Sequence, residues 1–503
     1  MTHSDRNSPS SRLNRRGFLQ KLPAIGAAAI LTHRTASTAT ADNPRAIPVA
    51  VPVAPADAKG STVTIRTETT LPIFAEADIC VLGGSCTGVF AAVRAARLGA
   101  KVVIVEKQNC FGGVATSSLI NIWHSIFDTE KKRQIIAGLT VETMERLGKR
   151  KAVVQPKNAS NWFTFNSQEL KIELDEIVLE NKVRPFLNTL FSEPYLDSAG
   201  QLAGVIVDGK SGRGVIKAKF FIDATGDADL CVRLGLETYV RPMLQPPTTA
   251  AHFEGFDNGA FNSLLKKHGA EFGIPDGFYW GAYLPNTQTY MLAGTRIYGA
   301  DCSNAKQLSD AEINGRRQIR AMLDMLRKYN PKNRTRLTAL SSYIGIRETR
   351  HVKCLFQTSD DDALYGKHFD DAIANGSYIF DQHHQDKPGI TFRSLDGTQN
   401  YVRPSYPSKG GRWRPKTAQN PTFYQVSLRS IIPPRIPNLI TAGRMLDAGL
   451  IAYSGIRVMV NMNQLGEAAG VAAQLSLSQN VPIQKISAAA VRDTLKKGGS
   501  AII

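Results

Sequence analysis

The stretch ADICVLGGSCTGVFAAVRAARLGAKVVIVEKQNCFGG, residues 77–113, decides the fold. It predicts a buried strand at Ile79–Leu82, a glycine turn, a helix over Val89–Leu98 and a second strand at Lys101–Val105. Short apolar strands of this kind are typical of a parallel sheet that is covered on both faces. The order of strand, glycine turn, helix and strand therefore predicts a dinucleotide-binding βαβ unit.

Small residues and one acid occupy the positions that such a unit needs. Gly83 permits a sharp turn, and Gly88 lets the helix pack close to the strand. Ser85 stands where the pattern usually has its middle glycine, and its small side chain still allows the backbone to approach a pyrophosphate. Glu106 follows Gly83 by 23 residues, where a carboxylate can accept hydrogen bonds from ribose hydroxyls. An α/β core that binds no dinucleotide remains the alternative.

Two later segments also combine an apolar strand with small residues at its end. Residues 220–229, FFIDATGDAD, run from a strand into Ala-Thr-Gly, and Asp227 could hydrogen-bond a ribose or ribityl hydroxyl. Residues 438–444, NLITAGR, form the other strand end, and a small-residue helix follows at 465–473. The start of that helix would offer N–H groups and a positive dipole end to an electron-rich ring carbonyl.

The glycine pair Gly112 and Gly113 would let backbone amides approach the cofactor phosphates again. No CxxxxC dithiol follows this pair, which excludes thiol–disulfide chemistry there. The six cysteines are scattered without a CxxC pair, so we expect neither an iron–sulfur cluster nor another metal site. Cys86 lies in the phosphate loop, where we expect a small residue that fills a tight loop; a thiol whose pKa is lowered by the helix N-terminus is the alternative.

The three motifs, taken in this order, resemble the FAD-dependent oxidoreductase family, which has the glutathione-reductase-type FAD fold and is distantly similar to fumarate reductase and succinate dehydrogenase flavoproteins. The segment GIRETRHV, residues 345–352, is also similar to that family, and the resemblance runs from about residue 78 to residue 474. It implies an FAD held by Gly83, Gly84, Ser85, Gly88, Glu106, Lys107, Gly113, Ala224, Thr225, Gly226, Asp227, Gly443 and Arg444. Some relatives, such as heterodisulfide reductase flavin subunits, carry 4Fe–4S clusters, but the cysteine ligand pattern for a cluster is missing here.

The predicted fold class is α/β. A Rossmann-like FAD-binding domain, with a parallel sheet, helices and an inserted β-meander, is joined to a mixed α+β substrate or cap domain. The predicted divisions are a signal peptide at 1–41, an extended linker at 42–74 with a possible strand at 63–65, the first part of the FAD-binding domain at 75–236, the cap at 237–429, the second part of the FAD-binding domain at 430–478 and a C-terminal tail at 479–503. Within the first part, a helix is expected at 168–181, a strand at 183–190 and a hairpin beyond it.

Charge limits the choice of partners. The 503-residue chain has a formal net charge of +18, and its mean hydropathy of -0.18 is that of a soluble globular protein. A basic balance can favour anionic substrates, polyanions or membrane surfaces, although a solvated basic surface explains it equally simply. No dense Lys/Arg run with interleaved aromatic residues is present, so we expect no nucleic-acid partner.

The N-terminal segment predicts export. Asn14–Lys21, NRRGFLQK, resembles the twin-arginine motif; an apolar stretch follows at Leu22–Leu31, and Ala39–Ala41 offers a cleavage site. We therefore expect the twin-arginine export machinery as a partner and a periplasmic or otherwise exported location. The apolar stretch is too short to span a bilayer, so no permanent membrane span is expected. A disordered basic tail is the alternative.

Four residues are the candidates for substrate orientation and proton transfer: His124, Arg347, His351 and Arg457. Arg347, or its neighbour Arg350, could clamp a carboxylate or stabilise an oxyanion, with His351 as the proton donor; an ion-paired structural turn is the alternative. The expected function is transfer of two electrons, as hydride, between FAD and a small organic substrate, with an unidentified electron acceptor. An NAD-linked oxidoreductase and a non-catalytic protein that binds polyanions at the cell surface are the alternatives.

Overall fold

The computed structural model describes residues 68–155, 162–276, 279–332, 334–403 and 406–503, all within one unit of the chain. The predicted signal peptide and the possible strand at 63–65 lie outside these ranges. The first described strand, β1, begins at Ile73, so it includes the last two residues of the predicted linker.

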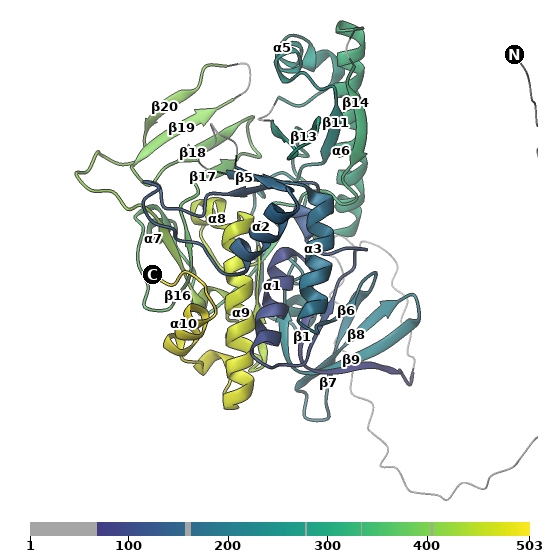
Figure 1. Cartoon of the computed structure of the whole chain (residues 1–503), viewed down its shortest axis with the longest axis vertical. Helices are drawn as coiled ribbons and strands as arrows, with labels where there is room; N and C mark the ends of the chain where they lie inside the picture. Colours follow the sequence, from purple (N-terminus) through teal and green to yellow (C-terminus); the bar gives the residue numbers. More distant parts are fainter. Residues whose placement is uncertain (1–67, 156–161, 277–278, 333, 404–405) are drawn as a thin grey trace, which may run out of the picture. The chain divides into compact units, whose positions relative to one another are not determined.

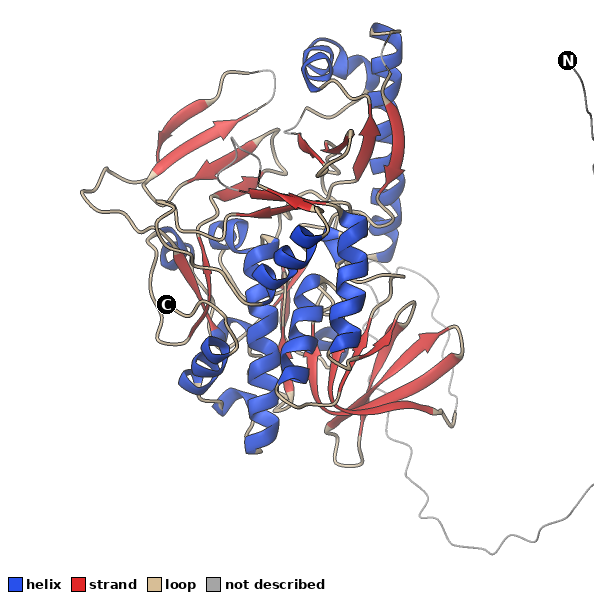
Figure 2. Ribbon diagram, viewed as in Figure 1, coloured by secondary structure: helices blue, strands red, loops and turns tan. Residues whose placement is uncertain are grey.

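The sheet that carries the predicted βαβ unit has seven strands in the order β6-β2-β1-β9-β8-β7, with β22 also paired to β9 (Figures 1 and 2). These strands are β1 Ile73–Leu82, β2 Val102–Val105, β6 Arg184–Phe186, β7 Leu190–Leu196, β8 Leu202–Gly209, β9 Gly212–Asp223 and β22 Leu439–Thr441. Residues 212–217 of β9 pair antiparallel with β8, residues 215–223 run parallel to β1, and residues 221–223 run parallel to β22. The parallel part with an attached β-meander confirms the predicted fold class.

Three helices lie side by side against this sheet: α1 Cys86–Arg97, α3 Ser167–Glu180 and α9 Met459–Gln479 (Figure 1). The predicted helices at 89–98 and 168–181 are thus present, and α1 begins three residues earlier than expected. Gly466 and Gly470 of α9 face α1, where an added Cβ would overlap with the carbonyl oxygens of Thr87 and Ala91. Small residues in this part of α9 therefore let the two helix backbones approach closely.

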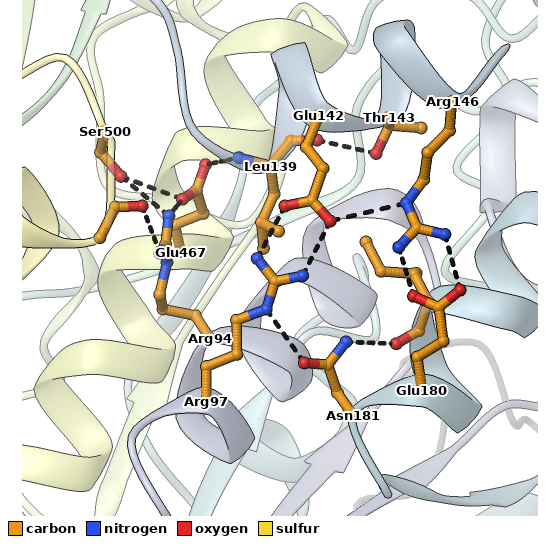
Figure 3. A network of polar contacts seen from close by, with 12 residues as sticks. Arg94, Arg97, Leu139, Glu142, Thr143, Arg146, Glu180, Asn181, Glu467 and Ser500 are labelled. Carbon is orange, nitrogen blue, oxygen red and sulfur yellow. Dashed lines mark hydrogen bonds and ion pairs between the residues drawn. The ribbon is translucent and has the colours of Figure 1, made fainter. Parts of the chain in front are cut away.

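A buried ion pair joins α1 to α9 and to the end of the chain (Figure 3). Arg94 pairs with Glu467, and its guanidinium also donates to Gly498 O at 2.7 Å and to Ser500 Oγ at 3.2 Å. The second carboxylate oxygen of Glu467 accepts from Leu139 N, at 3.0 Å, where helix α2 (Leu139–Lys149) begins. Residues 479–503, predicted as a tail, therefore pack against the helices, and they contain α10 (Ala488–Lys497).

The predicted cap contains two four-stranded antiparallel sheets. The first has the order β12-β13-β11-β14, with strands Trp280–Tyr283, Thr289–Ala293, Ala250–Glu254 and Arg336–Leu340, and it packs with helices α5 Asn258–His268 and α6 Ala305–Tyr329. The second has the order β17-β18-β19-β20, with strands Phe380–His383, Ile390–Arg393, Thr398–Val402 and Lys409–Arg412.

Shorter elements connect the sheets. The strands are β3 Ile122–His124, β4 Val153–Val154, β5 Trp162–Phe165, β10 Thr238–Val240, β15 Arg350–Val352, β16 Ala372–Gly376 and β21 Tyr424–Ser427. The helices are α4 Asp229–Arg233, α7 Asp360–Leu364 and α8 Leu450–Ile456, with single 3₁₀ turns at Gly113–Ala115, Gly269–Phe272, Leu428–Ile431 and Ile483–Lys485. The strand expected at 183–190 is divided between β6 and the start of β7. Among the described residues, no helix is both long and apolar enough to cross a membrane.

Candidate functional site

The turn after β1 is built for close backbone approach. Gly83 has a φ of +101°, and an added Cβ would overlap with the carbonyl oxygen of Ala224 at the end of β9. An added Cβ at Gly88 would overlap with the carbonyl oxygen of Gly83. Both positions therefore need glycine, because any side chain there would collide with a backbone carbonyl group.

Ser85 has a local task that explains the departure from the usual glycine pattern. It is the N-cap of α1, and its hydroxyl accepts a hydrogen bond from Gly88 N at 3.4 Å. The hydroxyl thus satisfies one of the free N–H groups of the first helical turn, while the others still face outward from the helix start.

Glu106, at the end of β2, accepts hydrogen bonds from Gly84 N at 2.5 Å and from Gln108 N at 2.7 Å. Burial raises the pKa of its carboxyl group even though these two N–H donors oppose the shift. The carboxylate therefore holds the glycine turn in place, and it also lines the adjoining cavity.

The second and third strand ends meet the glycine turn. Ala224 N donates to Leu82 O at 2.7 Å, and Ala442 N donates to Asp223 O at 2.8 Å. Gly226 has a φ of +82° and Gly443 a φ of +123°, conformations that favour glycine. Segments that are more than 140 residues apart in the sequence therefore converge at one edge of the sheet, as the carboxyl ends of neighbouring parallel strands should.

Asp227 and Arg444 form an ion pair at this edge. Asp227 also accepts from Thr349 Oγ1 at 2.7 Å. Although burial raises the pKa of Asp227, Arg444 and Lys107 hold it below its ordinary value. The aspartate is therefore ionised near neutral pH and can accept a further hydrogen bond from a hydroxyl group.

A cavity of about 930 Å³ opens along this edge. Its lining includes all of the predicted cofactor residues except Gly84 and Gly88, namely Gly83, Ser85, Glu106, Lys107, Gly113, Ala224, Thr225, Gly226, Asp227, Gly443 and Arg444. Met459, Met462 and Asn463 of the first turns of α9 also line it. This volume lies at the upper end of the range for small-molecule and cofactor sites.

Three of the four predicted catalytic residues line the same cavity: His124 at the end of β3, Arg347 in the loop before β15, and Arg457 directly after α8. Arg457 is ion-paired with Asp381. Arg347 donates to the carbonyl oxygen of Pro246 and, at 2.5 Å, to Thr248 Oγ1. The cavity thus brings together side chains from parts of the chain that the sequence analysis could not connect.

His351 does not line this cavity, which corrects its assignment as a proton donor there. It is fully buried in β15, which pairs with β10, and its Nδ1 is 3.0 Å from Leu446 O. Its Nε2 lies 3.1 Å from Glu348, which also pairs with Arg241. The alternative of an ion-paired structural turn fits His351 and Glu348, because they contact each other, Leu446 O and Arg241.

The sequence analysis missed three side chains that line the cavity: Tyr378, Asp381 and His383. Asp381 accepts from Tyr378 Oη at 2.8 Å and lies 3.5 Å from His383 Nε2. Asp381 and His383 are two residues apart on β17, so they point to the same face of the strand. No motif marks this segment; only the accumulation of polar and aromatic residues in SYIFDQHH, residues 377–384, could have suggested it.

Burial and nearby arginines keep the histidines of the cavity neutral. Burial, with Arg457, lowers the pKa of His124 to about 4 although Asp381 opposes the shift. Burial, with Arg347, Arg296 and Arg457, also lowers the pKa of His383 well below its usual value. The ring centroids of His124 and Tyr378 lie 3.9 Å apart with the planes tilted by 35°, and the neutral imidazole has a ring nitrogen that can accept a hydrogen bond.

The cysteine expectations have different outcomes. Burial raises the pKa of Cys86 to about 12, which agrees with the expected small residue in a tight loop and not with the alternative of a thiol activated by the helix N-terminus. All six cysteines are free thiols. In the described ranges, no three His, Cys, Asp or Glu side chains are grouped so that they could hold a metal ion.

Comparison with known proteins gives a family match over most of the chain. The sequence model of the family described as FAD dependent oxidoreductase matches residues 78–495. A mitochondrial dihydrolipoyl dehydrogenase of Schizosaccharomyces pombe is 29% identical over 163 residues, which cover 30% of this chain and 28% of that protein.

The solved structures that match this chain are more distant in sequence. A geranylgeranyl bacteriochlorophyll reductase-like protein of Thermoplasma acidophilum is 12% identical with a TM-score of 0.41, covering 84% of this chain and 83% of that chain. A p-nitrophenol 4-monooxygenase of Pseudomonas putida is 12% identical with a TM-score of 0.38, covering 84% of both chains. A flavin-dependent brominase is 9% identical with a TM-score of 0.42, covering 83% of both chains.

Proposed function

The chain belongs to the FAD dependent oxidoreductase family, and on this premise we propose that it transfers two electrons, as hydride, between FAD and a small organic substrate bound beside His124, Arg347 and Arg457. The observation that supports this proposal most is the single cavity, which is shared by the three glycine-containing strand ends and by these side chains. The family favours FAD over the NAD-linked alternative, and it favours an enzyme over a non-catalytic binding protein.

The residues present fit FAD. Gly83, Gly226 and Gly443 have backbone conformations that leave their positions free of side chains, and Gly113 approaches Ser85 so closely that an added Cβ would lie 2.9 Å from the Ser85 Cβ. The start of α1 would hold the pyrophosphate, and Glu106 and Asp227 would accept hydrogen bonds from hydroxyl groups. When bound, FAD supplies a ring system that can accept or release two electrons.

The protein side chains would orient the substrate. The neutral imidazole of His124 would accept a hydrogen bond from the substrate and orient it. Asp381 fixes the guanidinium of Arg457 by an ion pair and the hydroxyl of Tyr378 by a hydrogen bond, so both groups keep one orientation at the substrate. Trp280 and Phe392 also line the cavity and exclude water from part of it.

The test of this function uses the purified full chain. We expect a flavin absorbance spectrum that is bleached by anaerobic photoreduction and restored when dichlorophenolindophenol is added as an electron acceptor. Absence of a flavin spectrum would contradict the proposal. A bound flavin that stays reduced in the presence of this acceptor and of oxygen would instead support the non-catalytic alternative.

We also propose that residues 1–41 direct export through the twin-arginine machinery, which carries proteins already folded and therefore suits a chain that binds its cofactor before transport. The support is the Arg15–Arg16 pair followed by a short apolar stretch. Replacing Arg15 and Arg16 by lysine should leave the precursor in the cytoplasm, as fractionation and immunoblotting would show. Equal export of the variant and the natural chain would rule the proposal out.

A further inference from the structure

Three arginines gather at the cap side of the cavity. Arg347 and Arg457 line it, and Arg296 is buried beside them. Arg347 and Arg296 both donate to the hydroxyl oxygen of Thr248, at 2.5 and 3.2 Å respectively. Two guanidinium groups are therefore held next to each other by one shared acceptor, in spite of their like charges.

Among the described residues, Arg347 and Arg457 differ in their acceptors. Asp381 is the carboxylate that pairs with Arg457, whereas the acceptors of Arg347 are the neutral oxygens of Pro246 and Thr248. No described carboxylate lies within ion-pair distance of Arg347. Burial, together with Arg296 and Arg457, lowers the pKa of Arg347, which reflects the cost of keeping this cation charged in the cavity.

The neighbouring histidines add no positive charge at neutral pH. The pKa of His124 is lowered to about 4, and that of His383 is lowered well below its usual value. His124 faces Asp381 and Arg457, while Arg347, Arg296, Arg457 and His384 act on His383. The excess charge is thus arginine charge, and it does not change between pH 6 and 8.

Four polar atoms of cavity-lining residues have no partner within the described protein: Arg457 Nε, His383 Nδ1, Arg444 Nε and Asn463 Oδ1. A buried polar group without a partner is costly, so a ligand that supplies an acceptor to Arg457 would be stabilised there. The planar guanidinium fork matches the two oxygens of a carboxylate. Aromatic side chains of the same lining, Trp280, Phe392 and Tyr378, suit an apolar organic body.

We propose that the substrate is a small organic acid whose carboxylate is bound by Arg347 and Arg457, an assignment that rests on the proposed function. The carboxylate supplies a negative charge beside Arg347, whose acceptors among the described residues are neutral oxygens, and its organic part lies against the aromatic lining. Arg296 is a positioning residue, since it acts on the carboxylate through its contact with Thr248.

The test compares charged and neutral probes of the same shape. Benzoate and benzamide form one pair, malonate and malonamide the other, and each is titrated into the oxidised, FAD-containing full chain while the flavin absorbance is recorded. We expect at least one acid to give a saturable spectral change, with a dissociation constant at least about tenfold below that of its amide. The affinity should stay constant from pH 6 to 8.

Variants locate the binding group. Arg347→Gln should raise the dissociation constant of the acid by about 10- to 100-fold, and Arg347→Lys by less, with an unchanged FAD content that shows intact folding. Arg457→Gln should have a similar effect to Arg347→Gln. Arg414→Gln is the matched control, because Arg414 is a buried arginine that bonds to Leu395 O and Asn420 and does not line the cavity.

Several results would overturn the assignment while leaving the proposed function intact, because a flavin that is bound and reoxidised can still ignore organic acids. These are equal affinity for acid and amide, no binding of either acid, or an unchanged affinity in both Gln variants. If inorganic phosphate bound more tightly than either acid, the proposed ligand would be a phosphate-bearing molecule and not a carboxylic acid. If the affinity for the acid instead fell with rising pH, with a midpoint near pH 6.5, the positive charge that binds it would belong to a histidine.

Discussion

Replacing Gly83 by alanine should give a protein that purifies without FAD. The new methyl group would be placed against the carbonyl oxygen of Ala224, in a backbone conformation with φ of +101° that costs an L-residue about 1–2 kcal/mol. Since the obstacle is backbone and not a flexible side chain, the ends of β1 and β9 must move apart. We expect affinity for FAD to fall by more than about 100-fold and stability by about 2–5 kcal/mol.

Gly99→Ala is the matched control for this prediction. Gly99 has a φ of +94°, close to that of Gly83, but no atom lies within 4 Å of an added Cβ. It should therefore lose only about 1–2 kcal/mol and keep its FAD. Flavin absorbance per chain and urea unfolding would measure both effects; similar behaviour of the two variants would show that the close approach to Ala224 has no role.

Replacing Glu467 by glutamine should destabilise the protein by about 3–5 kcal/mol. Glu467 is buried between α1, α2 and the end of the chain, and the change leaves the Arg94 guanidinium buried without its counter-ion (Figure 3). Breaking a buried pair costs much more than its net contribution to folding, because the remaining charge cannot reach water. Chemical denaturation followed by circular dichroism would measure the change.

The neighbouring Arg97–Glu142 pair provides the control for this second prediction (Figure 3). Its side chains are about one third exposed (34% and 30%), so Glu142→Gln should cost less than about 1 kcal/mol. Equal losses for Glu467→Gln and Glu142→Gln would mean that burial of the Arg94 pair does not determine its contribution.

That the three strand ends meet at one edge of the sheet could be predicted from the sequence, because the rules for such segments are local. Each of the three segments is an apolar strand followed directly by small residues, and a strand end can be recognised without knowing its neighbours. The departure at Ser85 is also local, since the hydroxyl caps the helix that begins at the next residue. The parallel pairing of β1 with β2 follows from the βαβ topology, whereas β9 and β22 join this sheet from distant parts of the chain.

The substrate side could not be predicted in the same way. Tyr378, Asp381 and His383 reach the cavity because β17 pairs with β18 and packs on α8, contacts that no short motif encodes. His351 was misplaced because its neighbours Arg347 and Arg350 suggested a polar site, whereas β15 turns the imidazole into the interior. The face to which a side chain of a three-residue strand points depends on the register with its partner strand, and the sequence alone does not reveal that register.

The most direct test of the account is an equilibrium titration of the deflavinated full chain with FAD, followed by flavin and tryptophan fluorescence. Convergence of Gly83, Ala224 and Gly443 on one cavity predicts saturation at one FAD per chain, with weak or no binding in the Gly83→Ala variant and normal binding in Gly99→Ala. No saturable binding by the natural chain, or equal binding by Gly83→Ala, would contradict it.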